Sequence, residues 1–307
     1  LLARITNVDK LMQIKKLTLT NFRNHETYTH TFKNEVTVII GPNGTGKTNI
    51  LEAVHYLSTA KSLRTRYDVE IIAYDKKFCF VQGDISNEND SYGLEVQIIR
   101  NPKYENVSSK KVKINKLAKR VSSLTGLFTS VLFTPEDIEV LTKNPSTRRK
   151  YLDSVLTQTD TKYKITLSNY IKAVRQRNKV LEMMREFPSY ADQLDYWTEK
   201  ILTMGTYIQQ KRIELIESFD KSLVSRMKEL DLGKEMIKIE YLMSEITPRR
   251  LLEYKVKERA AGRTLIGPHK DDFIVRVDHH NIARYGSRGQ QRGIVLGVKL
   301  AEIDFIE

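Results

Sequence analysis

Hydrophobic and polar residues follow three different patterns along the chain, and the first of these, before residue 144, predicts mixed α/β structure. Alternating apolar residues over 13–20 indicate a strand, and the β-branched run 35–40 is typical of a strand buried on both faces. A glycine-rich turn follows, and apolar residues then recur at helical spacing over 47–59. Polar turns separate three further strand patterns, which lie at 78–85, 92–100 and 111–116.

The second pattern, over 144–262, predicts a mostly helical segment. Asn144 suits an N-cap, and apolar residues then recur at steps of three or four. A second helical stripe runs over 194–230 and is interrupted by Arg212. Two long helices joined near 187–190 would bury these stripes against each other, either as a projecting arm or as an ordinary helical subdomain.

The third pattern, over 263–307, predicts a return to α/β structure. It contains a strand at 273–278 and an apolar helix at 290–306. We therefore expect one lobe, formed by 12–143 and 263–307, with the helical segment inserted into it. The first twelve residues lack the basic start and the apolar stretch of a signal peptide, so we treat them as a short extension.

The composition indicates a globular, soluble and basic protein. Lysine and arginine number 51 and aspartate and glutamate 38 among 307 residues, which gives a formal net charge of +13. Hydrophobic residues make up 40%, enough for a core, and the basic excess indicates a polyanionic partner. The one cysteine, Cys79, cannot form an intramolecular disulfide, and no apolar run is long enough to span a bilayer. We therefore expect a cytoplasmic protein.

A phosphate-loop motif is the strongest chemical signal in the sequence. Residues 41–48 read GPNGTGKT, which fits G-x-x-x-x-G-K-[ST] and lies between a predicted strand and a predicted helix. The glycines let backbone N–H groups curl around a phosphate, and the helix points its positive end at the same place. Lys47 would reach the β and γ phosphates, and the Thr48 hydroxyl would bind Mg²⁺. The sequence thus predicts an ATP or GTP site formed by Gly41, Pro42, Asn43, Gly44, Thr45, Gly46, Lys47, Thr48 and Asn49.

A second, weaker motif reads SRGQQ at 287–291 and begins an apolar helix. By composition alone it is a polar turn that caps the helix. The Ser287 hydroxyl, the backbone approach that Gly289 allows and the helix dipole also describe a binder for a γ phosphate. The phosphate loop alone does not choose among kinases, GTPases, helicases and ATP-driven clamps, whereas this second motif favours the clamp.

Basic residues concentrate between positions 103 and 120, where there are seven lysines and arginines and one acidic residue, Glu105. Strand alternation places Lys111 and Lys113 on one face, which can lie along the phosphates of a nucleic acid. A lysine-rich strand is also a common protection for a sheet edge. The DNA contacts predicted from this segment are Lys110, Lys111, Lys113, Lys116, Lys119 and Arg120.

Seven segments, in a consistent order, resemble those of a known family. They are NFRN (21–24), GPNGTGKTN (41–49), AKSLRT (60–65), FTPED (133–137), NPSTRR (144–149), GPHKDD (267–272) and SRGQQR (287–292). From residue 12 to residue 307 the chain resembles the RecF family of bacterial recombination and repair ATPases, which is related to SMC and ABC-type heads. The resemblance implies an α/β fold, an ABC/SMC-type P-loop ATPase head with an inserted helical arm.

The same resemblance implies a mechanism and partners. Family members dimerise when ATP is bound, so that the phosphate loop of one subunit and the second motif of the other enclose each nucleotide. They bind double-stranded DNA near single-strand gaps and, with RecO and RecR, help to load RecA. On this basis we expect further nucleotide contacts from Arg23, Asn24, Arg64, Ser287, Gly289 and Gln290.

The given chain ends before a strand that the family pattern includes. The family places a Walker B strand, with a magnesium-binding aspartate and a catalytic glutamate, shortly after the helix that ends here near Glu307. We therefore expect no catalytic residue in this chain and no ATP hydrolysis by it, whereas the intact protein would hydrolyse ATP slowly. The alternative function is a small-molecule or nucleotide kinase that uses the same phosphate loop.

Overall fold

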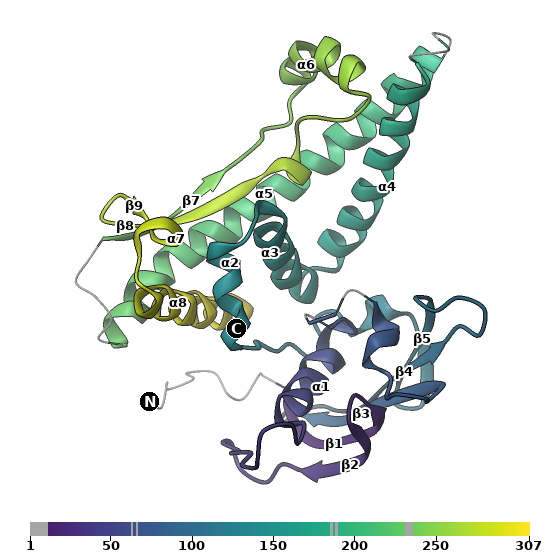
Figure 1. The fold of residues 1–307 in the computed structure, drawn as a ribbon, viewed down its shortest axis with the longest axis vertical. Coiled ribbons are helices and arrows are strands. Elements are labelled where there is room, and N and C mark those ends of the chain that lie inside the picture. The colour runs from purple at the N-terminus through teal and green to yellow at the C-terminus, as the bar shows by residue number, and fades with distance from the viewer. Residues whose placement is uncertain (1–11, 63, 66, 185–186, 188–189, 231–235) are drawn as a thin grey trace. The chain divides into compact units, whose positions relative to one another are not determined.

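The chain forms two compact units in the computed structural model (Figure 1). Unit 1 comprises Leu1–Leu132 with Glu307, and unit 2 comprises Phe133–Ile306. Among the described helices, none combines the length and the apolar character that a membrane span requires. The residues that the structure describes are 12–62, 64–65, 67–184, 187, 190–230 and 236–307.

Unit 1 is built on a six-stranded antiparallel sheet, against which the helix α1 (Lys47–Thr59) packs (Figure 1). In β1, Leu17 and Leu19 are fully buried, whereas the alternate residues lie on the opposite face. α1 approaches the sheet closely because Gly83 has no side chain; a Cβ there would lie 2.5 Å from Leu57 Cδ1. In sheet order the strands are β2 (His25–Thr31), β1 (Gln13–Phe22), β3 (Phe78–Ser86), β4 (Ser91–Arg100), β5 (Ser108–Ile114) and β6 (Leu117–Lys119).

Most elements predicted for this unit are confirmed, but the buried strand predicted over 35–40 is wrong. The segment forms no strand, and Val36, Val38 and Ile40 are 65%, 75% and 89% exposed. The segment is rich in β-branched residues, as buried strands are. However, no described strand pairs with the segment, so its backbone N–H and C=O groups lack the partners that a sheet supplies.

Unit 2 is mainly helical, and its two longest helices, α4 (Thr161–Met183) and α5 (Ala191–Glu229), pack side by side (Figure 1). The core includes Leu215, Phe219 and Leu223 of α5, which are buried together with residues of α3 and α8. A small antiparallel sheet, in the order β7–β8–β9, packs against α5. The other elements are α2 (Glu139–Thr142), α3 (Pro145–Thr159), β7 (Ile237–Leu242), α6 (Pro248–Ala261), β8 (Asp272–Val277), β9 (His280–Asn281), α7 (Ile282–Tyr285) and α8 (Arg288–Ile306).

The helical segment begins as predicted but is divided differently. The N-cap is confirmed, because the side chain of Asn144 accepts a hydrogen bond from the backbone N–H of Thr147 at 3.2 Å. The single helix predicted to follow is two helices, since Asp160 ends α3 and caps α4 by accepting from the N–H of Tyr163 at 2.8 Å. Of the predicted turn near 187–190, residues 188–189 lie outside the described residues.

Two further features of unit 2 differ from the prediction. The strand β7 lies inside the segment that was predicted to be mostly helical. Residues 263–306 group with the helices of unit 2, whereas the sequence assigned them to the lobe that carries the phosphate loop. The boundaries of the three-part division stay a prediction.

Candidate nucleotide site

The phosphate loop lies at the start of α1, where two glycines adopt left-handed backbone angles. The φ values are 86° at Gly44 and 94° at Gly46, a region that other residues enter only with strain. Gly46 is also restricted by contact, because a Cβ there would lie 2.4 Å from Oδ1 of Asn24. Gly44 and Gly46 are therefore required by the path of the chain. The exposed part of the loop comprises Gly41, Pro42, Asn43, Gly44 and Thr45.

The side chain of Lys47 folds back over this loop. Its Nζ donates hydrogen bonds to the carbonyl oxygens of Gly41 at 2.8 Å and Pro42 at 2.7 Å, while Thr45 Oγ1 donates to the Pro42 carbonyl at 3.0 Å. The ammonium group is thus fixed beside the backbone that would surround a phosphate. This position fits the role predicted for Lys47.

The N-terminus of α1 is suited to an anion. It has no side-chain cap and no acidic residue in its first turn, so neither competes with an anion for the positive end of the helix dipole. Thr48 is exposed, and its hydroxyl makes no hydrogen bond among the described residues. Thr48 is therefore available as a magnesium ligand, and the residues present fit the predicted nucleotide and Mg²⁺.

The turn between β1 and β2 lies against the phosphate loop. Asn24 Nδ2 donates to the carbonyl of Gly44 at 3.2 Å, and Asn49 Nδ2 donates to Asn24 Oδ1 at 2.8 Å. The carbonyl of Gly46 accepts a hydrogen bond from His25 Nε2 at 3.1 Å. The structure thus brings Asn24, Asn49 and His25 to the loop, and the nucleotide contacts predicted for Asn24 and Asn49 stay predictions.

Arg23 and Arg64 meet at one carboxylate, that of Glu52 on α1. Arg23 donates to it with two nitrogens, at 3.0 and 2.6 Å, and Arg64 with one, at 3.3 Å. The side chain of Glu52 is only 2% exposed. No role for Glu52 was predicted from the sequence. The signal that could have indicated one is that Glu52 is the only acidic residue in α1.

The second motif forms a reciprocal cap at the start of α8. Ser287 Oγ accepts from the N–H of Gln290 at 3.2 Å, and Gln290 Oε1 accepts from the N–H of Ser287 at 2.9 Å. Ser287, Gly289 and Gln290 are all exposed, and a Cβ at Gly289 would meet nothing closer than 3.9 Å. The geometry agrees with a helix cap, and the predicted γ-phosphate contact stays a prediction.

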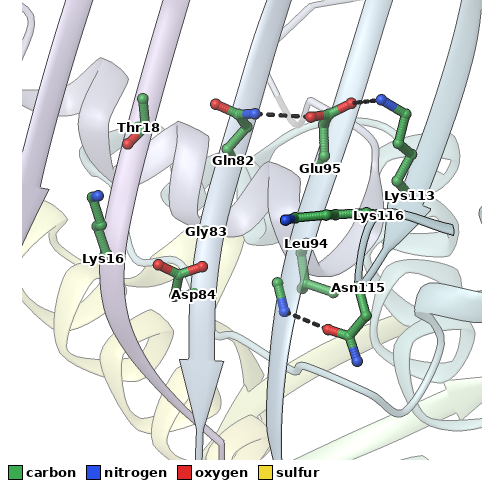
Figure 2. Close-up of a pocket in the computed structure, with 11 residues that line it drawn as sticks. Lys16, Thr18, Gln82, Gly83, Asp84, Leu94, Glu95, Lys113, Asn115 and Lys116 are labelled. Atoms are coloured by element: carbon green, nitrogen blue, oxygen red, sulfur yellow. Dashed lines mark hydrogen bonds and ion pairs between the residues drawn. The ribbon is translucent and has the colours of Figure 1, made fainter.

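The predicted basic strand face is present, and its charges are partly neutralised. Lys111 and Lys113 share the face of the sheet opposite α1, which carries a hollow of about 520 Å³. Figure 2 shows Gln82, Glu95 and Lys113 in a row across β3, β4 and β5; Gln82 and Lys113 each contact Glu95 at 2.8 Å. The remaining exposed candidates are Lys111, Lys116, Lys119 and Arg120.

Lys110 lies on the other face of the same strand, toward α1. Its Nζ is 2.8 Å from Asp68 Oδ2 and 5.3 Å from the ring centroid of Tyr56, and the side chain is 16% exposed. Burial and Asp68 raise the pKa of the Tyr56 hydroxyl, which donates a hydrogen bond to Asp68 at 3.1 Å. Lys110 and Lys113 therefore each have an acidic partner within the unit, Asp68 and Glu95 respectively.

The fold and the phosphate loop together define the class of P-loop heads of the SMC and ABC type. An Smc head domain from Pyrococcus furiosus matches 96% of this chain and 80% of its own, with a TM-score of 0.52 and 14% identity, and so supports the fold. A family model described as the RecF/RecN/SMC N-terminal domain matches residues 13–303.

Closer matches identify the family within this class. The DNA replication and repair protein RecF of Bacillus thuringiensis (strain Al Hakam) is 35% identical over 310 residues, which cover 96% of this chain and 81% of that protein. A solved structure described as the recombination mediator protein RecF with ATP in the RecFOR pathway matches 97% of this chain and 82% of its own, with a TM-score of 0.87 and 29% identity. The chain belongs to the RecF family.

Proposed function

We propose that this protein is an ATP-dependent DNA-binding protein of recombinational repair and replication-fork maintenance. Nucleotide binds at the phosphate loop, where Lys47 neutralises the β and γ phosphates and the Thr48 hydroxyl binds Mg²⁺. The observation that carries the proposal is the preformed loop, with Lys47 Nζ fixed on two loop carbonyls and an uncapped α1 behind it. The similarity to RecF with ATP supports it.

ATP controls the association of two subunits in this proposal. The Ser287 motif of one subunit closes over the nucleotide held by the loop of the other, and the closed dimer holds double-stranded DNA near a single-strand gap. Lys111, Lys116, Lys119 and Arg120 supply positive charge for the DNA backbone. RecO and RecR are the proposed partners, through which the protein helps to load RecA.

Sedimentation with and without ATP tests this function. Lys47→Ala removes charge-assisted hydrogen bonds to phosphate, so we expect ATP affinity to fall by about tenfold or more. Ser287→Arg is expected to leave ATP binding intact and to abolish the ATP-dependent dimer. Lys33→Ala, which removes an exposed lysine outside the motif, is the matched control.

Retention of duplex DNA by the dimer should fall steeply with salt. Each neutralised phosphate lowers log K by about 0.9 per log unit of salt. A protein that stays monomeric with ATP and DNA, and transfers phosphate to a metabolite, would be a kinase instead. Unchanged dimerisation in Ser287→Arg would contradict the shared nucleotide site.

A further inference from the structure

A buried carboxylate organises two guanidinium groups beside the phosphate loop. Glu52 is 2% exposed and accepts hydrogen bonds from Arg23, from Arg64 and from the Ser62 hydroxyl at 2.6 Å. A buried carboxylate is costly unless several donors satisfy it, and these three side chains do so. Because Ser62 Oγ also accepts from the backbone N–H of Arg64 at 3.0 Å, Glu52 fixes both ends of that residue.

The two arginines are held in different ways. Arg23 uses all three side-chain nitrogen positions, two on Glu52 and one on the Glu70 carbonyl at 3.0 Å, and its side chain is only 17% exposed. Arg64 uses Nη1 alone, and its side chain is 40% exposed. Among the described residues, Nε and Nη2 of Arg64 donate to nothing, so they are free to bind a ligand.

The position of Arg64 is defined relative to the nucleotide site. Its Nη1 also donates to Oδ1 of Asn49 at 2.9 Å, and Asn49 lies in the first turn of α1, next to Thr48. The guanidinium is therefore tied to the end of the helix at which an anion is favoured. A planar guanidinium with two unused nitrogens matches the geometry of phosphate oxygens.

We propose that Glu52 is a positioning residue that holds Arg64 at the N-terminus of α1, so that its free nitrogens contact the triphosphate. This rests on the ATP binding of the proposed function. One carboxylate shared by two arginines leaves a net positive charge, so the group of Glu52, Arg23 and Arg64 still attracts an anion. It also fixes a long, flexible side chain before the ligand arrives, which reduces the entropy lost on binding.

Glu52→Gln is the sharpest test, because it keeps the shape and removes the charge. The amide turns an N–H donor toward guanidinium groups that are themselves donors, so Arg64 is released. We expect the affinity for a fluorescent ATP analogue with Mg²⁺ to fall about three- to tenfold, the range for the ordering of one long side chain. Glu70→Gln makes the same charge change at an exposed side chain and should leave the affinity unchanged.

A double-mutant cycle separates positioning from general damage to α1. If Glu52 acts through Arg64, Glu52→Gln has no further effect on ATP affinity in an Arg64→Gln background, whereas a packing defect persists there. Ser62→Ala, which keeps the Glu52 charge and removes its link to the Arg64 backbone, should weaken binding in the same direction and provides the test if Glu52→Gln does not fold.

Four results decide the matter. Full ATP affinity in Glu52→Gln, or an undiminished effect of that change in the Arg64→Gln background, overturns the positioning role. If Glu52→Gln cannot be purified folded, full affinity in Ser62→Ala does so. A wild-type protein whose weak binding of ATP equals that of Lys47→Ala overturns the proposed function instead, and the inference that rests on it.

Discussion

The two units each contain a buried carboxylate that holds arginine, and the two sites differ in what they leave exposed. Glu52 of unit 1 is 2% exposed, but its partner Arg64 is 40% exposed. Asp271 of unit 2 is fully buried, and its partner Arg212 is only 2% exposed. The first site can therefore be reached by a ligand, whereas the second is closed.

The closed site uses all three side-chain nitrogens of Arg212. Its nitrogens bond Asp271 at 3.1 Å, Asp153 at 2.8 Å, the Pro268 carbonyl at 2.7 Å and the Tyr163 hydroxyl at 3.3 Å. Burial by itself lowers the pKa of Arg212, but the adjacent acidic groups, Asp153 foremost, raise it well above its ordinary value. Similar residues thus build a scaffold where every guanidinium nitrogen is used, and a candidate site where, among the described residues, two nitrogens of Arg64 are not.

Removal of the buried arginine should have the largest effect on stability. Arg212→Met leaves Asp271 and Asp153 without their cation, and breaking a buried pair typically costs about 3 to 5 kcal/mol. The free energy of unfolding can be measured in urea by the fluorescence of Trp197, the one tryptophan of the chain, which lies on α5 of the same unit.

The neighbouring residue provides the control for this change. Lys211 pairs with Glu214 at the surface, at 2.7 Å, so Lys211→Met should cost less than about 1 kcal/mol. Equal losses in the two variants would mean that Arg212 is no more important for the fold than a surface ion pair.

A histidine beside this scaffold should make unit 2 sensitive to acid. His269 Nε2 lies 3.2 Å from the Thr264 carbonyl, which can only accept, and His269 Nδ1 lies 2.8 Å from the Tyr170 hydroxyl. Nδ1 therefore accepts from Tyr170 in the neutral ring. Burial, with smaller contributions from nearby cations such as Lys270, lowers the pKa of His269 from 6.5 to about 4.

The direction of the pH effect follows from that lowered pKa. Between pH 6.5 and 4 the unfolded chain binds a proton that the folded chain does not, so His269 contributes stability above pH 6.5 that is lost as the pH falls toward 4. The loss should be about 2 to 3 kcal/mol. The urea midpoints of wild type and of His269→Gln are measured between pH 6.5 and 4, and the wild-type midpoint should fall further than that of the variant. A difference between the two midpoints that does not change with pH would contradict the lowered pKa of His269.

Local features of the fold could be predicted from the sequence, and partnerships between distant residues could not. The phosphate loop, the bounds of α1 and the Asn144 cap depend on neighbouring residues, and all three are present. Glu52 and Arg23 are 29 residues apart, and Arg212 and Asp271 are 59 apart, so no local pattern links them. Arg212 interrupts an apolar stripe for this reason: its partners come from other elements. The segment 35–40 shows the converse, since strand composition without a paired neighbour forms no strand.

The smallest expected effect on stability is that of removing Arg64. It tests whether the Glu52 site of unit 1 differs from the closed Asp271 site of unit 2. Arg64→Gln should cost less than about 1 kcal/mol, because the side chain is 40% exposed and bonds through one nitrogen. Arg23→Gln should cost about 1 to 3 kcal/mol, because a buried carboxylate loses a two-nitrogen contact. Cys79, buried in β3 of the same unit, reports the unfolding, since burial raises the pKa of its thiol to about 12 and slows its alkylation in the folded state. If Arg64→Gln destabilises unit 1 as much as Arg23→Gln does, then Arg64 is part of the scaffold, as Arg212 is, and is not held free for a ligand.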